Sequence, residues 1–550
     1  MSQTPPLGHD SPALRKARGA FFTPPELCSF VAEWAVRSES DRILEPSCGE
    51  AAFLLATGSY LQTLGATEVG KQLFGVELHD DSARRAKRLL AAEGFDAQVG
   101  AGDFFEAEVP GPFDVVVGNP PYVRYQDFTG TARARSQEAA LAQGVRLTGL
   151  ASSWASFVVH ASQHLTPDGR LGLVLPAELL TVNYAANVRE YLLARFASVQ
   201  LVLFESRVFP GVTEEVVLLL AEGTGPTDHF ELYLADDLDD LPKPETIATK
   251  WTPTLAAGKW SGALLKSDAA ELFATVVSSA HFEELLEWGD PNLGMVTGNN
   301  NYFALTYDDI GEWGLKPADL LPISPPGSRH LRSLSFTGAR WSKLANEGAR
   351  AFLFYPRGDK LSNGANAYIA HGQELGVHEA YKCRVRDPWW RVPLVPVPDL
   401  FLTYMNHDAP RLVANRIRAR YLNSVHGVEL KQGRREIGKS LLPLAMLNSA
   451  TLLGAELVGR SYGGGILKLE PKEADVLPVP SLSAVTAAAP ELRKLRPSAS
   501  ALLSQGRLPD VVALVDAVML RSTARRTAAE VKLLDKSREA MFARRSARRG

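Results

Sequence analysis

The sequence predicts an α/β protein with a mostly parallel sheet of seven strands, followed by a mixed α+β domain and a helical C-terminal segment. Short apolar runs alternate with helical stretches between residues 42 and 221. Strands of this nearly continuous apolar kind are buried on both faces by helices. Beyond about residue 254 the alternation disappears and turns rich in glycine, proline and asparagine become frequent, which predicts a different second domain.

The strands of the sheet are expected in apolar runs, at residues 43–45, 73–77, 98–99, 113–118, 170–175, 201–204 and 216–220. Helices are expected between them, at residues 82–93, 154–165 and 188–195. A further helix is expected before the first strand, because Thr23-Pro24-Pro25-Glu26 has the form of a capping box with proline in the first turn. Sheets of this kind bind ligands beyond the carboxyl ends of their strands, so functional residues are expected there.

The predicted domain boundaries follow these patterns. Residues 1–19 are expected to be a flexible leader, residues 20–240 the sheet domain, residues 245–485 the mixed domain and residues 486–550 a helical basic segment. The acidic stretch 222–253, which contains proline and glycine, has the composition of a connection between domains.

Composition excludes several classes of protein. Hydrophobic residues make up 45% and charged residues 22% of the chain, which is typical of a globular protein. No apolar run reaches the roughly 18 residues of a membrane span, and the N-terminus has no secretory pattern, so a cytoplasmic protein without a membrane partner is expected. The three cysteines form no C-x-x-C pair, so no metal is expected.

Charge is distributed unevenly along the chain. The net charge is −3, but residues 521–549 hold ten Lys or Arg against three acids. Such a basic segment favours a polyanion through counterion release. A solvated helix end without a target explains the same charges equally well.

The strongest motif is Asn119-Pro120-Pro121-Tyr122, directly after the predicted strand 113–118. Two prolines hold the turn rigid. The Asn119 amide oxygen and the Pro120 carbonyl can then accept both N–H groups of a planar amine, which frees its lone pair for attack on a methyl sulfonium. Tyr122 can stack on the ring of a flipped base. The alternative is a tight turn with a packed tyrosine.

Three other strand ends carry candidate ligand-binding residues. Gly49 follows the first strand and opens a helix, so a ligand can approach the backbone there. Glu77 ends the second strand, where an acid can hold both hydroxyls of a ribose. Asp103 and Phe104 follow the third strand and can bind an adenine by its amino group and its face. The alternatives are a plain turn, a solvated helix-capping acid, and an ordinary turn Asp beside a core Phe.

Four motifs, in this order along the chain, resemble those of the γ-class N6-adenine DNA methyltransferases. They are Phe22-Thr23-Pro24-Pro25, Leu44-Glu45-Pro46-Ser47-Cys48-Gly49, Gly102-Asp103-Phe104 and Asn119-Pro120-Pro121-Tyr122. The resemblance covers roughly residues 20–225. It implies a Rossmann-like fold, S-adenosylmethionine as cofactor, double-stranded DNA as substrate and a target-recognition domain after the sheet. It also makes a cognate restriction endonuclease or a defence system an expected partner, and a monomer the expected state.

The resemblance also implies roles for individual residues. Thr23 would contact the methionine end of the cofactor, although a role as helix N-cap also explains it. Glu45 and Gly49 would line the methionine and sulfonium region. Phe157 matches an aromatic beside the cofactor, with a core role equally open, and Phe209 matches an aromatic that packs on the flipped base.

The second domain resembles the recognition domain of that family more loosely. The segment Leu293-Gly294-Met295-Val296-Thr297-Gly298-Asn299 resembles its G-x-x-T-G turn, and Lys382, Arg384 and Arg386 are candidates for phosphate contacts beside Trp389 and Trp390. Tyr462-Gly463-Gly464-Gly465 matches another recurring piece.

Other functions are weighed against this one. Methyltransferases that act on protein glutamine or on RNA share the Asn-Pro-Pro-Tyr type of turn, but they are usually shorter. A catalytically silent DNA-binding protein would have no need of the intact motif. Asp399 with Glu429 and Lys431 has the residue types of a nuclease site, but their spacing is long. No phosphate-binding loop of the Walker type is present.

Overall fold

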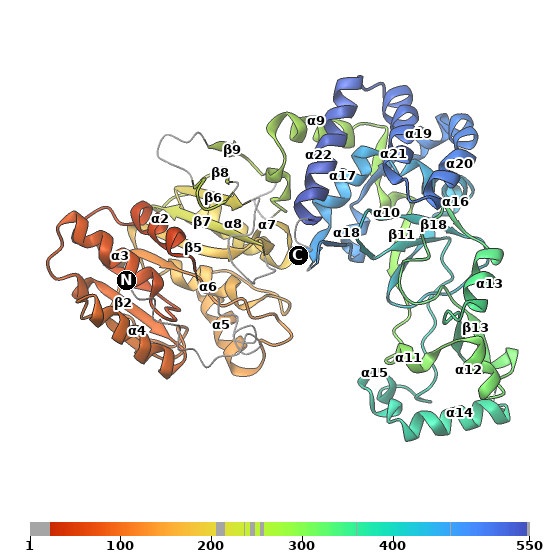
Figure 1. Cartoon of the computed structure of the whole chain (residues 1–550), viewed down its shortest axis with the longest axis horizontal. Coiled ribbons are helices and arrows are strands. Elements are labelled where there is room, and N and C mark those ends of the chain that lie inside the picture. The colour runs from red at the N-terminus through yellow and green to blue at the C-terminus, as the bar shows by residue number, and fades with distance from the viewer. Residues whose placement is uncertain are drawn as a thin grey trace, which may run out of the picture. The chain divides into compact units, whose positions relative to one another are not determined.

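The computed structural model describes residues 23–204, 215–235, 237–241, 248–253, 258–358, 360–462 and 464–546. The chain folds into two compact units, Met1–Ala263 and Leu264–Gly550 (Figure 1). The predicted leader, residues 1–19, lies outside the described residues. The sequence places the end of the sheet domain at residue 240, whereas the units divide after Ala263.

A nine-stranded sheet forms the centre of the first unit, in the order β3-β2-β1-β4-β5-β7-β6-β8-β9. Its strands are β1 (Ile43–Glu45), β2 (Leu73–Glu77), β3 (Gln98–Ala101), β4 (Phe113–Gly118), β5 (Leu165–Pro176), β6 (Ser198–Phe204), β7 (Val216–Glu222), β8 (Phe230–Ala235) and β9 (Thr249–Trp251). Strands β1 to β5 are parallel, β7 runs antiparallel between β5 and β6, and β9 is an antiparallel edge.

All seven predicted strands are present, so the α/β class is confirmed. The count of seven is wrong, because β8 pairs with β6 and β9 pairs with β8 inside the stretch 222–253. This stretch therefore extends the sheet. Its polar composition hid the two strands, since β8 alternates buried and partly exposed residues near the edge.

Helices cover the sheet, and they are α2 (Pro25–Ala35), α3 (Ala52–Leu64), α4 (Asp80–Ala92), α5 (Gly130–Ala142), α6 (Ser153–Ser162), α7 (Glu178–Thr181) and α8 (Ala186–Arg195). The helices α2 and α3 pack on each other and on strands β1, β2, β4 and β5, whereas α6 packs on α5, α8 and β5 (Figure 1). Buried Val31 of α2, Leu54 of α3 and Val117 of β4 share one core. The strand order changes direction between β1 and β4, which is the position where such sheets bind ligands.

The second unit is mixed α+β, as predicted. Its strands are β10 (Phe282–Glu284), β11 (Gly289–Leu293), β12 (Ala304–Leu305), β13 (Leu320–Pro322), β14 (Ser335–Phe336), β15 (Phe352–Phe354), β16 (Leu400–Thr403), β17 (Met405–Asn406), β18 (Leu412–Asn415), β19 (Val425–Leu430), β20 (Arg460–Tyr462), β21 (Ile466–Lys468) and β22 (Pro478–Pro480). The largest sheet of this unit has the order β11-β19-β16-β18-β14.

The helices of this unit are α9 (Ser267–Val277), α10 (Leu285–Trp288), α11 (Asn300–Phe303), α12 (Tyr307–Glu312), α13 (Gly338–Asn346), α14 (Asn363–Glu374), α15 (Tyr381–Arg384), α16 (Arg435–Ala445), α17 (Ser449–Val458), α18 (Pro471–Asp475), α19 (Leu482–Ala487), α20 (Ala489–Ser504), α21 (Leu508–Asp516) and α22 (Ala528–Ser546). Ser362-Asn363-Gly364 has the composition expected of a turn, but it begins α14, because the Ser362 hydroxyl accepts from the Ala365 N–H as the helix N-cap.

The C-terminal segment is helical, as predicted, and its helices share the core of the second unit. Leu492 of α20 and Val511 of α21 pack with Leu442 of α16 and Leu400 of β16. Within the described ranges, no single helix is long and apolar enough to cross a membrane; only the bent pair Gln432–Ala445 and Ser449–Val458, at 88°, reaches that length and composition.

Candidate active site

The predicted catalytic turn directly follows β4. The Asn119 carboxamide donates through Nδ2 to the Thr23 hydroxyl at 3.2 Å. Its Oδ1 is buried and has no hydrogen-bond partner among the described residues. A buried acceptor without a partner lowers stability by roughly 1–3 kcal/mol. The turn therefore holds an oriented oxygen that is available to a ligand donor.

Thr23 does not cap a helix, so the predicted capping box is wrong. Helix α2 begins at Pro25 with Pro24 as its N-cap residue, and no side chain caps it. Glu26 is exposed. Because Thr23 lies outside the helix, its hydroxyl accepts from Asn119 across the sheet. A tertiary contact here replaces the local one that the motif suggests.

The rest of the turn is anchored on both sides. The Tyr122 hydroxyl donates to the Val174 carbonyl of β5 at 2.9 Å, and its ring is half-buried against the sheet core. Ser153 Oγ donates to the Pro121 carbonyl and accepts from the Val123 N–H at 2.9 Å. The Ser153 N–H in turn donates to the Val123 carbonyl at 3.1 Å.

Sequence reasoning missed Ser153. A serine at the first position of a predicted helix has no local feature that marks it as functional. Only the packing of α6 beside the turn brings its hydroxyl to the Pro121 carbonyl and the Val123 N–H. Three hydrogen bonds to residues on either side of Tyr122 make Ser153 the residue that positions the catalytic turn.

The turn after β1 lies beside the end of β4. Glu45 is 3% exposed and accepts from the Leu54 N–H at 3.0 Å, in the first turns of α3. A methyl group added at Gly118 would lie 3.7 Å from Glu45 Cγ, so β1 and β4 are in close contact here. Burial raises the pKa of the Glu45 carboxyl well above its ordinary range, and the Glu77 charge adds to the shift. Ser47 Oγ is a second buried atom without a partner among the described residues.

Glu77 joins two of the loops. Its Oε2 accepts from the Gly49 N–H at 2.9 Å, and its Oε1 accepts from the His79 N–H at 3.0 Å. Gly49 has φ +50°, in the left-handed region that glycine adopts without strain. The Glu77 carbonyl also accepts from the Gly102 N–H at 2.9 Å, which places the loop after β3 beside it. The loops after β1, β2, β3 and β4 thus form one continuous edge.

Aromatic rings cluster at the loop after β3. Phe104 is 3% exposed and stacks on Phe157 of α6, with ring centroids 5.5 Å apart and planes at 26°. Phe105 is only half-buried and meets Phe157 edge-on at 4.9 Å. Asp103 Oδ1 accepts from the Phe105 N–H at 3.0 Å, which fixes the turn. Phe157 therefore contacts both phenylalanines of this loop.

Sequence reasoning also missed His160 of α6. Its ring lies 4.7 Å from the Phe104 ring, edge to face, and its Nε2 is 3.3 Å from the Phe104 carbonyl oxygen. Burial lowers the pKa of His160, so the ring is neutral at ordinary pH. His160 thus supports the Phe104 turn without adding a charge.

Two further predictions concern a single residue and metal binding. Phe209 lies outside the described residues. Over the described part of the chain, no group of three or more His, Cys, Asp or Glu is placed to hold a metal ion. The nuclease-like Asp399 accepts from Arg435 Nε at 2.9 Å and lies 3.4 Å from Lys439 Nζ, so its carboxylate is paired with two cationic side chains.

In the second unit, the G-x-x-T-G turn is held by residues that the sequence suggested for phosphate binding. Arg386 donates to the carbonyls of Thr297, at 2.7 Å, and Val296, at 2.5 Å. Gly298 has φ +93°, and a Cβ there would lie 3.0 Å from Cys383 Sγ. The Arg386 guanidinium therefore uses two of its N–H donors on the turn, and its phosphate contact stays a prediction.

Two family models match consecutive parts of the chain. Residues 7–238 match the N-6 DNA Methylase family, and residues 257–520 match the C-terminal domain of the type II methyltransferase M.Eco57I. The chain belongs to the DNA N6-methyltransferase family of restriction–modification systems. This confirms the resemblance stated from the sequence motifs.

Individual relatives agree with this assignment. The methyltransferase is 26% identical over 495 residues to the type II methyltransferase M.XamI of Xanthomonas campestris pv. amaranthicola, which covers 87% of each chain. It is 22% identical to M.AccI of Acinetobacter calcoaceticus, over 84% of each chain. The solved structure of the type IIL restriction–modification enzyme MmeI in complex with DNA covers 94% of this chain and 75% of that chain, with a TM-score of 0.58 and 11% identity, which shows a shared fold.

Proposed function

We propose that the methyltransferase transfers a methyl group from S-adenosylmethionine to the N6 amino group of an adenine flipped out of double-stranded DNA. The observation that carries this proposal is the Asn119 carboxamide, whose Nδ2 is held by Thr23 while Oδ1 is buried and unpartnered. An amino N–H of adenine is the donor that such an acceptor lacks.

The reaction requires a nitrogen lone pair that is normally delocalised into the purine ring. Asn119 Oδ1 and the Pro120 carbonyl would each accept one N–H, which draws the nitrogen toward a tetrahedral geometry. Tyr122, with its hydroxyl fixed on Val174, would stack on the base. The cofactor supplies a methyl sulfonium, an electrophilic carbon with a neutral leaving group. The methylated nitrogen then loses one proton to solvent, and positioning provides most of the catalysis.

The residues along the shared edge fit the cofactor. Glu77 keeps lone pairs beyond its two backbone hydrogen bonds, and these can accept from the ribose hydroxyls. Asp103 would accept from the adenine amino group beside Phe104 and Phe157. Thr23, Glu45 and Gly49 would face the methionine and sulfonium end. Phe209 remains a proposed contact to the flipped base.

The domain after the sheet favours DNA as the substrate. Residues 257–520 match the C-terminal domain of a type II DNA methyltransferase, which a methyltransferase of protein glutamine or RNA would not need. We therefore propose that this domain recognises the target sequence. The methyltransferase would act beside a cognate restriction endonuclease or within another defence system, as a monomer.

The decisive experiment compares Asn119→Ala with Asn187→Ala, an exposed asparagine of α8 that donates to the Arg146 carbonyl. Tritiated methyl transfer is measured in parallel on DNA, RNA and protein, together with the dissociation constant of the cofactor. We expect Asn119→Ala to abolish transfer to DNA with cofactor binding largely kept, and Asn187→Ala to behave as wild type. Near-normal turnover of Asn119→Ala, or transfer only to RNA or protein, would contradict the proposal.

A further inference from the structure

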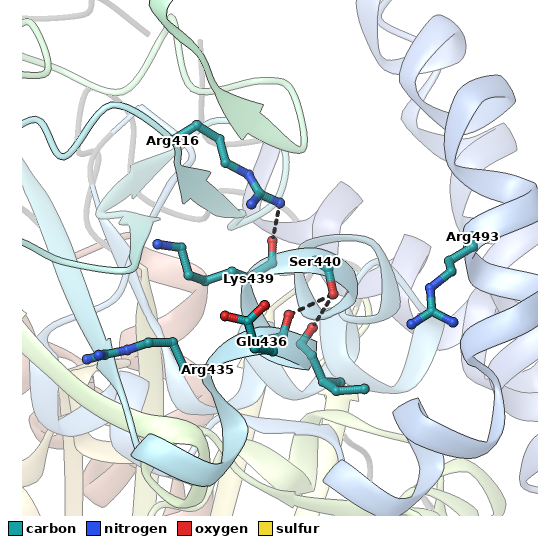
Figure 2. A pocket seen from close by; sticks show the side chains of 7 residues that line it. Arg416, Arg435, Glu436, Lys439, Ser440 and Arg493 are labelled. Atoms are coloured by element: carbon teal, nitrogen blue, oxygen red, sulfur yellow. Dashed lines mark hydrogen bonds between the residues drawn. The ribbon is translucent and has the colours of Figure 1, made fainter.

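A pocket with a volume of about 320 Å³ lies within the second unit. The loop after β18, the first turns of α16 and the helix α20 form its walls. Figure 2 shows the side chains that line it, with Arg416 from the loop, Arg435 and Lys439 from α16 and Arg493 from α20. Nothing in the sequence motifs marks this pocket, because its residues come from three separate segments.

The lining of the pocket is strongly basic. Four cationic side chains face one acid, Glu436. Asp399, which is not part of the lining, neutralises part of this charge, because its carboxylate lies 2.9 Å from Arg435 and 3.4 Å from Lys439. The other two cations, Arg416 and Arg493, have no acidic partner among the described residues. The pocket therefore keeps an excess of positive charge.

One basic side chain of the lining and one behind it are held by uncharged groups instead of acids. Arg416 donates to the Lys439 carbonyl at 3.1 Å, which fixes the loop after β18 on α16. Behind the pocket, Arg496 donates to the Ser440 carbonyl and to Ser335 Oγ, the latter at 2.9 Å. Burial, and secondly the charge of Arg416, lowers the pKa of Arg496. The fold thus holds like charges together, which is unfavourable until an anion binds.

The chemistry of the lining favours a bare phosphate. Guanidinium groups present paired N–H donors that match the oxygens of a phosphate. The first turn of α16 adds the positive end of an eleven-residue helix. Ile437 is the one apolar side chain of the lining, and no aromatic ring lines the pocket, so nothing there would stack on a base. A free nucleotide bound in this pocket would therefore have no stacking contact for its base.

We propose that this pocket binds a backbone phosphate of the DNA that the enzyme methylates. The inference rests on the proposed function, because it assigns the second unit to the DNA. Arg435 and Glu436 are exposed, as are Arg416 and Arg493, so a phosphate on a duplex can approach from solvent. A contact of this kind positions the duplex and carries no base information.

The test measures the dissociation constants of two unrelated DNA duplexes of equal length against salt concentration, by fluorescence anisotropy. The variants are Arg493→Ala, Arg416→Ala and the double variant. The control is Lys494→Ala, the next residue on α20, which is exposed, loses the same charge and does not line the pocket. Each lost contact should weaken both duplexes about equally, by roughly 3- to 10-fold, and reduce the slope of log K against log salt by about 1.

The outcomes distinguish DNA binding at the pocket from methyl transfer at the proposed active site. Lys494→Ala should bind like wild type, and an equal loss in Lys494→Ala and Arg493→Ala would overturn the proposal. Loss on one duplex alone, or an unchanged salt slope, would overturn it as well. Wild-type enzyme that binds DNA through these residues but transfers no methyl group would refute the proposed function and leave the pocket standing. If an alanine variant folds poorly, DNA binding is measured instead on the charge-reversing variant Arg493→Glu, and its urea midpoint checks that this variant is folded.

Discussion

Asn119 and Thr23, 96 positions apart in the chain, meet through one hydrogen bond of 3.2 Å from the carboxamide Nδ2 to the hydroxyl Oγ1. This bond decides which end of the amide faces the ligand. With the nitrogen occupied, the oxygen is the group left for a substrate N–H. The orientation of the Asn119 side chain, the proposed catalytic group, thus depends on a residue that precedes the first helix.

Replacing Thr23 tests this relationship. Thr23→Val keeps the shape and removes the acceptor, so the amide can rotate and present its nitrogen to the substrate amine. We expect kcat to fall about 5-fold, since one hydrogen bond contributes roughly 1 kcal/mol, while Thr23→Ser stays near wild type. Single-turnover methyl transfer and cofactor binding are the measurements. Weaker cofactor binding at unchanged kcat would assign Thr23 to the cofactor alone.

Ser153 is expected to control the geometry of the catalytic turn. Ser153→Ala removes the donor to Pro121 and the acceptor for Val123, so kcat should fall about 10-fold or more, and the free energy of unfolding by roughly 1–3 kcal/mol. Ser156→Ala, on the same helix, is the matched control, because its hydroxyl bonds only the Ser153 carbonyl. The cofactor dissociation constant should stay unchanged in both. If both variants lose activity equally, Ser153 supports the helix and not the turn.

Cofactor binding should release a proton from Glu45. Burial raises the pKa of this carboxyl, which favours its protonated form in the unliganded site, whereas a bound sulfonium favours the charged form. Titration calorimetry in buffers of different ionisation enthalpy measures the number of protons released per cofactor bound, which should be greater than zero. Glu45→Gln should bind more weakly and release none. A wild-type binding enthalpy that is independent of the buffer would contradict this assignment.

The stability of the second unit should fall as pH rises from about 4 to about 7, because of Asp516. Its carboxyl accepts from the Ser449 N–H and hydroxyl, and burial raises its pKa to about 7. Within that window the folded chain keeps a proton that the unfolded chain releases, so raising the pH favours unfolding.

Urea midpoints between pH 5 and 7 check this expectation. Asp516→Asn should flatten the pH dependence, whereas Asp510→Asn, an exposed residue of the same helix paired with Arg507, should keep the wild-type slope. A wild-type stability that rises over this window would show that Asp516 is ionised in the folded protein.

The basic C-terminal helix is expected to stabilise the fold through Arg545. This side chain is 3% exposed, pairs with buried Glu456 at 2.8 Å and donates to the Asp408 carbonyl at 3.0 Å. Arg545→Ala should lower the free energy of unfolding by roughly 3–5 kcal/mol, because it leaves a buried charge alone. Lys536→Ala, exposed on the same helix, should change it by less than about 0.5 kcal/mol. Weaker DNA binding at unchanged stability would reverse this interpretation.

The sequence by itself determined seven of the nine strands of the sheet and the positions of the loops that follow them. Runs such as residues 113–118 are apolar apart from Asp114, and residues of this kind are buried in a sheet that helices cover on both faces. All seven expected strands are therefore present. The rule that ligands bind at the carboxyl ends of such strands then made Asn119, Glu77 and Asp103 the candidate site residues. These inferences need only local composition and the alternation of strand and helix.

The tertiary structure alone decided which partners these residues have. The capping pattern at Thr23 is local, but a hydroxyl bonds whichever group the fold brings near, and the fold brings Asn119. Ser153 and the basic pocket around Arg416 and Arg493 join segments far apart in the chain. Hydrogen bonds and charges act over a few ångströms in space, a distance that the order of residues does not encode until the chain has folded.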